Sequence, residues 1–334
     1  MAVDETREST DNDAGLETGV VIRSPGSWYE VQVGRDVYRA QIRGKFRLEE
    51  RLATNPIAVG DRVTIRPETN PSESAPHGSA LIVEIHERTN KLTRRAAGRR
   101  PGLEHVIVAN VDFAWAVQSI LLPKLNPGFI DRFIVMAEYH GIPAGLIFNK
   151  ADLLTDPIRE AVESYRELYQ GLGYPVLMTS TKTGEGIGDL QSQLTRKTTV
   201  LTGPSGVGKS SLINAARPDL QVRTAEVSSR TRKGRHITSN ATLYPLDAGG
   251  FLIDTPGLRE FGIVDITPEE LAHYFVEFRP FLGECRFPNC THDHEPDCAV
   301  IRAVEQGGPI DEERWLSYLN ILASVRHGDG DVGR

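Results

Sequence analysis

The segment GPSGVGKS, residues 203–210, is the most informative part of this chain. It fits the pattern GxxxxGK[ST], in which glycines let backbone N–H groups curl around phosphate oxygens and a helix N-terminus adds its dipole. The apolar segment TTVLTG precedes it as a predicted strand, and SSLINAA follows it as a predicted helix. The segment therefore predicts a nucleoside triphosphate site, with ATP and GTP still open.

Each residue of this loop is expected to take part in binding the nucleotide. Lys209 would reach the outer phosphates and assist catalysis, and Ser210 would hold Mg²⁺. The predicted phosphate-binding residues are Gly203, Pro204, Ser205, Gly206, Val207, Gly208, Lys209, Ser210 and Ser211.

The segment NKAD, residues 149–152, favours guanine as the base. It follows the apolar strand AGLIFN, and parallel α/β sheets bind ligands at such strand ends. The Asp152 carboxylate can accept both the ring N–H and the exocyclic amine of guanine, a pattern that adenine lacks, and the Lys150 stem would cover the base face. Asn149 completes the motif, and Ser180 and Lys182, after the next strand, would close the pocket. An ATP-dependent enzyme is disfavoured by Asp152.

The segment DTPG supplies the DxxG element that completes a GTP site. Asp254 can support Mg²⁺ through water, and the Gly257 amide can face the γ-phosphate. An ordinary small GTPase has its phosphate loop first and its guanine motif late. Here the guanine motif precedes the phosphate loop by about fifty residues, which is a rotation of the usual order. One circularly permuted GTP site explains every motif and its strand context.

Three cysteines and one histidine near the C-terminus form a candidate metal site. The spacing is C-x4-C-x-H-x5-C, and it contains every cysteine of the chain. Three thiolates and one imidazole suit a closed, tetrahedral, structural Zn²⁺ site, one per chain. The expected ligands are Cys285, Cys290, His292 and Cys298, with His294 as a competing ligand.

The rest of the chain predicts a modular α/β protein. Five short strands in residues 18–87 suggest a small barrel, most simply an OB-fold. Alternating strands and helices then predict a mostly parallel sheet with helices on both faces. The expected domains are an acidic disordered tail (1–17), an OB-fold barrel (18–90), a basic linker (91–103), a permuted GTPase domain (104–264) and a helical zinc module (265–328). Within the module, TPEELAHYFVEF predicts a capped helix over 267–278.

Charge and hydropathy point to a cytoplasmic protein with no membrane segment. The chain has no apolar run of about 18 residues and no signal-peptide pattern at its start. Most of the net charge of −7 lies in the acidic tail. Residues 88–102 carry six basic residues and no acid: Arg88, Lys91, Arg94, Arg95, Arg99 and Arg100. This run is either a solvated linker or a strip that lies along phosphates.

Taken together, the motifs resemble the ribosome small-subunit-dependent GTPase A (RsgA) family. The marks are AVGDRV (58–63), NKAD before GPSGVGKSSLIN, RKGRHITSNATLY (232–244), DTPGLREFG (254–262) and the Cys-Cys-His-Cys cluster. The resemblance implies an OB-fold, a permuted GTPase domain and a zinc module. It also implies GTP hydrolysis stimulated by the small ribosomal subunit, contact with ribosomal RNA, a role in late subunit maturation, and help in releasing an assembly factor. We expect a monomer that exchanges GTP and GDP.

The first switch loop departs from the family pattern. The family usually has His-Thr-Thr-Thr, whereas this chain has His236-Ile237-Thr238-Ser239. Thr238 is the expected magnesium-sensing hydroxyl, with Ser239 as a rival.

Leu258 stands where many GTPases carry a glutamine that orients the attacking water, so intrinsic hydrolysis should be slow. His236 is the candidate for that role, since imidazole can accept or donate a proton near neutral pH. An RNA contact or a solvated loop position would equally explain this histidine.

A second interpretation keeps the nucleotide site but changes the function. The chain could be a GTP-gated RNA-binding module, such as a translational regulator, whose hydrolysis is incidental. Subunit-dependent turnover distinguishes the two interpretations.

Overall fold

The computed structural model describes residues 15–42, 56–68, 78–95, 104–216, 241–254 and 266–327. The chain divides into two compact units: residues 1–110 with 240–243, and residues 111–239 with 244–334. None of the helices in the described ranges has both the length and the hydrophobicity that a membrane-spanning helix needs.

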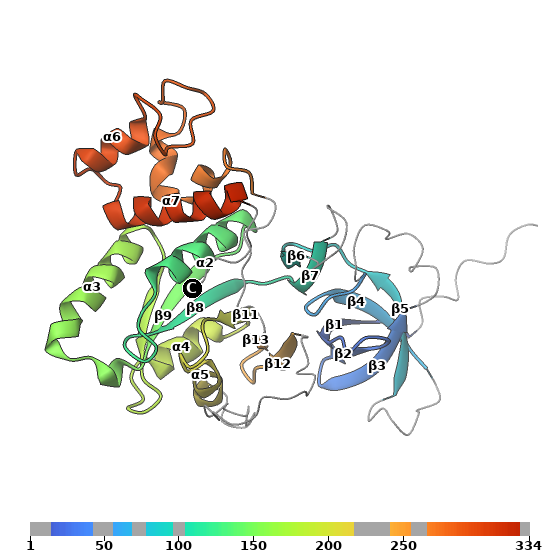
Figure 1. Ribbon diagram of the computed structural model, residues 1–334. Coiled ribbons are helices and arrows are strands. Elements are labelled where there is room, and N and C mark those ends of the chain that lie inside the picture. Colours follow the sequence, from blue (N-terminus) through green and yellow to red (C-terminus); the bar gives the residue numbers. More distant parts are fainter. Residues whose placement is uncertain are drawn as a thin grey trace, which may run out of the picture. The chain divides into compact units, whose positions relative to one another are not determined.

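The first unit contains a closed five-stranded barrel (Figure 1). Its strands are β1 (Glu17–Arg23), β2 (Tyr29–Val33), β3 (Asp36–Ile42), β4 (Arg62–Pro67) and β5 (Ser79–Ile85). The pairing order is β1-β2-β3-β5-β4, and β4 pairs back to β1. All pairs are antiparallel except β3 with β5. This ring confirms the OB-like barrel expected from the sequence.

Alternating side chains fill the barrel because successive residues of a strand point to opposite faces. On β2, Tyr29 and Val31 are buried while Glu30 and Gln32 are partly exposed. The barrel core consists of small and branched apolar residues and one tyrosine: Val21, Tyr29, Val31, Ala40, Ile57, Val63, Ile65, Ala80 and Ile82.

Part of the segment expected as a linker forms a strand. β6 (Lys91–Arg95) pairs antiparallel with β7 (Glu104–Ala109) in a separate two-stranded sheet. Residues 96–103 between them lie outside the described ranges. Residues 91–95 of the basic run are thus paired backbone rather than unstructured chain.

The AVGDRV segment contains a buried ion pair that was not expected from the sequence. The Asp61 side chain is fully buried and accepts the Ala58 N–H at 2.7 Å. Arg88 donates to both of its carboxylate oxygens, each at 2.7 Å. Arg88, the first residue of the basic run, therefore has an internal partner.

The second unit is built on five parallel strands in the order β10-β9-β8-β11-β13. Their bounds are β8 (Phe113–Ser119), β9 (Ala144–Asn149), β10 (Val176–Thr179), β11 (Lys197–Thr202) and β13 (Gly250–Asp254); β12 (Thr242–Pro245) has residues in both units. The chain runs from β8 outward to β10, then returns past β8 to β11. This reversal between β8 and β11 is a topological switch point, where such sheets bind ligands at the strands' carboxyl ends.

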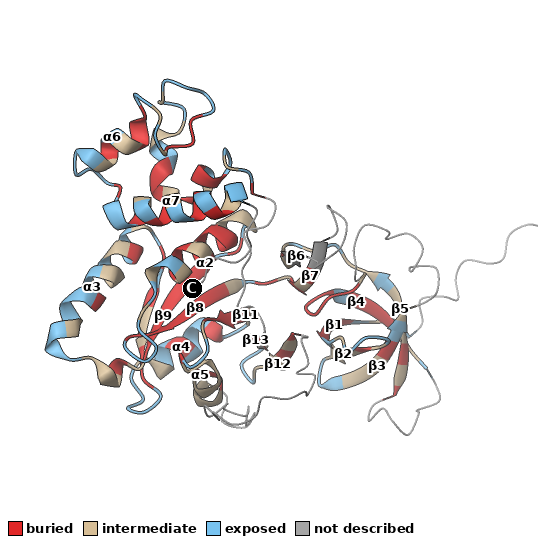
Figure 2. Cartoon of the chain, in the orientation of Figure 1, coloured by how far each residue is buried: buried red, intermediate tan, exposed pale blue. Residues whose placement is uncertain are grey.

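Helices cover both faces of this sheet (Figure 1). Their bounds are α2 (Pro127–Tyr139), α3 (Asp156–Gly171), α4 (Ile187–Leu194) and α5 (Lys209–Ala216), with a short 3₁₀ helix η1 (Ala151–Leu153). α2 packs on β8 and β9, whereas α4 packs on β11 and against α5. Strands β8 and β9 between these layers are almost wholly buried (Figure 2).

The C-terminal segment packs on the far side of α2. It comprises η2 (Leu271–Tyr274), η3 (Val276–Phe281), α6 (Ala299–Glu305) and α7 (Glu312–His327). The continuous helix predicted over 267–278 is wrong, because the backbone is extended at Phe275. Arg279 Nε donates to the His273 carbonyl at 2.9 Å, replacing the backbone donor of a continued α-helix. Pro280 has no N–H to continue one.

A buried ion cluster joins this segment to the sheet-covering helices. Arg314 of α7 is 1% exposed and bonds to Asp131 of α2 and to Glu277 of η3. Tyr169 of α3 donates to Asp131 at 2.8 Å. Although burial alone would lower it, the two carboxylates raise the pKa of Arg314 above its usual value. One guanidinium thus bonds to two buried carboxylates, and Tyr169 bonds to one of them. We call these four side chains the Arg314 cluster.

Candidate active site and metal centre

Buried polar side chains gather at the carboxyl ends of the parallel strands. Ser119, Asn149 and Thr179 end β8, β9 and β10 and stand in register with one another. Thr202 ends β11, and all four residues are at most 2% exposed. Buried polar groups are stable only when hydrogen-bonded, so these side chains must bond to each other or to loops above them.

Asn149 joins the guanine motif to the phosphate loop. Its Nδ2 donates to the Val207 carbonyl at 2.8 Å, and its Oδ1 accepts the Thr179 hydroxyl at 3.0 Å. A Cβ at position 208 would lie 2.3 Å from Asn149 Nδ2, and Gly208 has φ +99°. Only glycine fits there, so two motifs far apart in the sequence form one packed unit, which we call the Asn149 joint.

Lys150 makes a second connection between the same two segments. Its backbone is left-handed, with φ 64°. Its Nζ donates to the Gly206 carbonyl at 2.7 Å and to the Leu122 carbonyl. The lysine therefore extends from the guanine motif to the phosphate loop.

Asp152 is held by the residues predicted to close the base pocket. The Ser180 hydroxyl donates to Asp152 Oδ1 at 2.7 Å, and Lys182 Nζ lies 3.5 Å from Oδ2. The Ser180 oxygen in turn accepts the N–H groups of Lys182 and Thr183, each at 3.2 Å. The hydrogen bond from Ser180 lowers the pKa of Asp152 below its usual value. The carboxylate is thus kept ionised, the form that only accepts hydrogen bonds.

The phosphate loop follows β11 and leads into α5. Gly203 has φ +152°, and a Cβ there would lie 2.1 Å from the Val117 carbonyl. Val207 is fully buried and packs in the core beneath α4 and α5. Lys209 Nζ donates to the carbonyls of Gly203 and Pro204 at 2.6 and 2.9 Å. Its ammonium group therefore lies against the start of the loop.

The structure describes only some of the remaining residues that were predicted to bind the nucleotide. Ser210 and Ser211 are half-buried in the first turn of α5, and Asp254 is the last residue of β13. Gly257, His236 and Thr238 lie outside the described residues, as does Ser239. Sequence reasoning missed the Leu122 carbonyl, because any residue supplies a carbonyl and only the fold brings this one to Lys150.

The four predicted metal ligands converge in space. The ligand atoms of Cys285, Cys290, His292 and Cys298 all lie within 4.8 Å of one another. Cys285 Sγ is 3.8 Å from Cys298 Sγ, and His292 Nδ1 is 3.3 Å from Cys298 Sγ. Tetrahedral zinc with Zn–S bonds of about 2.3 Å requires sulfur atoms roughly 3.8 Å apart. The donor set and its spacing therefore fit a closed tetrahedral site.

Burial disfavours the charged forms of three side chains in this cluster. Burial raises the pKa values of the Cys290 and Cys298 thiols, so bare thiolates are disfavoured there at neutral pH. Burial lowers the pKa of His292 and keeps its imidazole neutral, the form that binds metal. A divalent cation would supply the positive charge that buried thiolates need.

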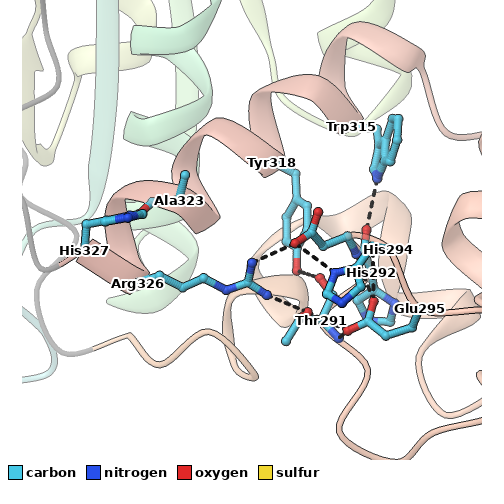
Figure 3. Close-up of polar contacts among 10 residues, drawn as sticks. Thr291, His292, His294, Glu295, Trp315, Tyr318, Ala323, Arg326 and His327 are labelled. Carbon is cyan, nitrogen blue, oxygen red and sulfur yellow. Dashed lines mark hydrogen bonds and ion pairs between the residues drawn. The ribbon is translucent and has the colours of Figure 1, made fainter.

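Hydrogen bonds from α7 fix the loop that carries the ligands (Figure 3). Trp315 Nε1 donates to the His292 carbonyl at 3.1 Å, and the Tyr318 hydroxyl donates to the Thr291 carbonyl at 2.6 Å. The Thr291 hydroxyl and N–H both donate to the Glu295 carboxylate, at 2.6 and 2.7 Å.

Glu295 and His294 lie on the same loop, but Glu295 is hydrogen-bonded within it and His294 is exposed. Burial alone would raise the pKa of Glu295, but hydrogen bonds from Thr291 and the loop backbone hold it well below its usual value. His294 is 76% exposed at its side chain and pairs with Asp293 at 3.2 Å. The imidazole inside the cluster is therefore that of His292.

Comparison with known proteins places the chain in a family. The family model described as RsgA GTPase matches residues 85–264, and the RsgA N-terminal domain model matches residues 18–73. The chain is 39% identical over 311 residues to "Small ribosomal subunit biogenesis GTPase RsgA" of Bacteroides fragilis, covering 93% of this chain and 97% of the relative. It is 43% identical over 305 residues to the protein of that name from Gemmatimonas aurantiaca, covering 91% and 96%.

Two solved structures share the fold. YjeQ from Thermotoga maritima matches with a TM-score of 0.75 and 35% identity, covering 93% of this chain and 99% of that one. YloQ, described as a circularly permuted GTPase, matches with a TM-score of 0.71 and 29% identity, covering 97% and 100%. The order of motifs, the Asn149 joint and these matches lead to one conclusion: the chain belongs to the RsgA family of circularly permuted GTPases.

Proposed function

We propose that this protein hydrolyses GTP in support of late maturation of the small ribosomal subunit. The observation that carries the proposal is the Asn149 joint, which unites a guanine motif and a phosphate loop into one site. The relatives' printed name, small ribosomal subunit biogenesis GTPase, supports the biological setting. We further propose that the protein acts in the cytoplasm as a monomer, contacts ribosomal RNA and helps to release an assembly factor.

The residues at the strand ends would divide the work of binding and catalysis. Asp152 would accept the ring N–H and exocyclic amine of guanine, and the Lys150 stem would cover the base. The backbone N–H groups of residues 203–210 would surround the phosphates, with Lys209 neutralising their charge. Mg²⁺ bound with GTP would offset the remaining phosphate charge, held by Ser210 and Thr238 and supported by Asp254.

Catalysis would depend on the bound subunit. Leu258 has no hydrogen-bonding group to orient water, so unstimulated hydrolysis would be slow. We propose that subunit binding brings His236 to the attacking water, where it orients the nucleophile.

The four ligands of the metal centre would hold one structural zinc ion. Structural zinc contributes folding free energy directly, because the site exists only in the folded chain. We propose the domain division 1–17, 18–90, 91–103, 104–264 and 265–328, with RNA contact shared among the barrel, the basic run and the zinc module.

Measuring GTP turnover with and without purified small ribosomal subunits tests this function. We expect marked stimulation by subunits in the wild type and loss of most of that stimulation in His236→Ala, with GTP affinity unchanged. Stimulated turnover at the wild-type level in His236→Ala would reject the histidine but keep the GTPase. Binding to free messenger RNA together with turnover that ignores subunits would instead favour the translational regulator.

A further inference from the structure

The loop between β8 and α2, residues 120–126, is fixed by hydrogen bonds at several points. Ile120 N–H donates to the Asn149 carbonyl at 3.1 Å, and Leu122 N–H donates to the Ser119 hydroxyl oxygen at 3.2 Å. At its far end, Asn126 N–H donates to Gln118 Oε1 at 3.2 Å. Gln118 therefore ties the end of the loop back to the strand from which it starts.

Gln118 is unusual for its position. It is 1% exposed, on a strand whose neighbouring residues Ala116 and Val117 are fully buried. A buried amide is costly unless its polar atoms are bonded, and here Nε2 donates to the Val117 carbonyl at 3.3 Å while Oε1 accepts from the loop. Both polar ends of the Gln118 amide are therefore hydrogen-bonded, and the bond from Asn126 N–H fixes the backbone at the end of the loop.

The loop brings one carbonyl to the guanine motif. Lys150 Nζ donates to the Leu122 carbonyl on one side and to the Gly206 carbonyl on the other. Pro123 Cδ lies 3.7 Å from the place a Cβ of Gly206 would take, so the loop and the phosphate loop are neighbours. A lysine side chain has many rotamers, and two carbonyl acceptors define its path far better than one.

We propose that Gln118 is a positioning residue for guanine-nucleotide binding. It holds the 120–126 loop so that the Leu122 carbonyl and the Gly206 carbonyl together direct the Lys150 side chain across the base site. The inference rests on the proposed function, in that Lys150 must cover a bound guanine base. Contact with the base face does not depend on the base's edge substituents, so Gln118 affects affinity and leaves the discrimination made by Asp152 intact.

A double-mutant cycle tests the proposal through equilibrium titrations of GDP and IDP. Gln118→Leu, which keeps the size but removes the amide, should weaken GDP binding about tenfold. IDP lacks the exocyclic amine and should lose the same factor, leaving the GDP-to-IDP ratio unchanged. In a Lys150→Met background, Gln118→Leu should cost no further affinity. Gln191→Leu, a glutamine replacement on α4, is the matched control and should bind GDP as the wild type does.

Three results would overturn the inference: unchanged GDP affinity in Gln118→Leu, losses that add fully in the double variant, or a changed GDP-to-IDP ratio. If Gln118→Leu does not fold, Ser119→Ala removes the acceptor for Leu122 N–H and should follow the same cycle with a smaller loss. Wild-type protein that binds no GDP would reject the proposed function itself, a result distinct from all of these.

Discussion

The nucleotide site and the metal centre lie in the same unit but are held in shape differently. The first stands on the ends of parallel strands, and its principal side chains bond to one another: Asn149 to the phosphate loop, Lys150 to two carbonyls, and Asp152 to Ser180. The second lies on a loop between η3 and α6, where three thiols and one imidazole face each other.

The two sites therefore differ in the interactions that stabilise them. Hydrogen bonds and strand pairing define the nucleotide site before any ligand contact is considered. In the metal centre, burial raises the pKa of the Cys290 thiol and lowers that of the His292 imidazole, so burial disfavours the charged form of each. If the cluster holds structural zinc as proposed, the ion would supply folding free energy there. Changes to the metal centre should therefore affect folding, and changes to the nucleotide site should affect binding alone.

Replacing one metal ligand should have the largest effect. Structural zinc contributes about 10–16 kcal/mol in small zinc domains at neutral pH. Cys290→Ser should lose the single zinc ion and the hydrogen-exchange protection of residues 266–327, while GDP affinity stays within about twofold. Metal analysis and hydrogen exchange measure both outcomes. His294→Ala is the matched control and should retain zinc, and a full zinc equivalent in Cys290→Ser would contradict the assignment.

Breaking the Arg314 cluster should have the next largest effect. Arg314→Met leaves Asp131 and Glu277 buried without a cation, which should cost about 3–5 kcal/mol in the free energy of unfolding. Urea denaturation measures this quantity. Arg166→Met removes a partly exposed ion pair with Glu163 and should cost about 0–1 kcal/mol. Equal losses of unfolding free energy in Arg314→Met and Arg166→Met would show that burial does not determine the energetic contribution of the cluster.

Changing Asp152, the carboxylate that we propose reads the base, should affect binding and leave folding intact. Asp152→Asn replaces an ionised acceptor by an amide and should weaken GTP binding roughly 10- to 100-fold, while binding of XTP improves. Binding titrations with GTP and with XTP measure this change in nucleotide selectivity. Asp156→Asn, in the exposed first turn of α3, should alter neither affinity. Selectivity that stays with GTP in Asp152→Asn would remove the carboxylate from the base site.

The smallest expected effect lies in the metal-bearing loop. Because the pKa of folded Glu295 is below the unfolded value of about 4.3, its contribution is complete above that pH and is lost as pH falls toward the folded pKa. Glu295→Gln should cost about 1 kcal/mol at neutral pH, since an amide oxygen retains part of the bonding. The free energy of unfolding of both proteins should be measured as a function of pH. The difference between them cancels the titration of all other groups. A difference that stays constant down to pH 3 would contradict this prediction, and Glu284→Gln, on the exposed surface, is the control.

The sequence predicts those parts of the molecule that depend on local backbone geometry. A phosphate loop needs glycines at fixed spacing between a strand and a helix. The segment GPSGVGKS therefore predicts the strand before it and the helix after it. The alternating strands of the barrel and the spacing of the metal ligands are likewise read from neighbouring residues. These features hold in the structure because each is specified within a short segment.

Contacts between distant residues leave no such signal. Asp131 and Arg314 are 183 residues apart, and Asp61 and Arg88 are 27 apart, so nothing local marks either pair. The predicted helix over 267–278 fails because of a nearer contact, between residues six apart. Its capping pattern is present, with Thr267 N–H bonded to Glu270, but a guanidinium from beyond the segment takes a carbonyl that an α-helix would use.

The Asn149 joint also explains why the order of motifs along the chain is free to change. The amide of Asn149 reaches the phosphate loop through space, and β8 meets β11 by strand pairing, so neither contact uses the covalent connection between them. The last part of that connection is the short link from α4 to β11 at residues 195–196. A protein nicked there would have two fragments that share one interlocking surface, much as two halves of a split enzyme do. Chain continuity and active-site geometry are therefore separate properties of this fold, and either can be altered while the other is kept.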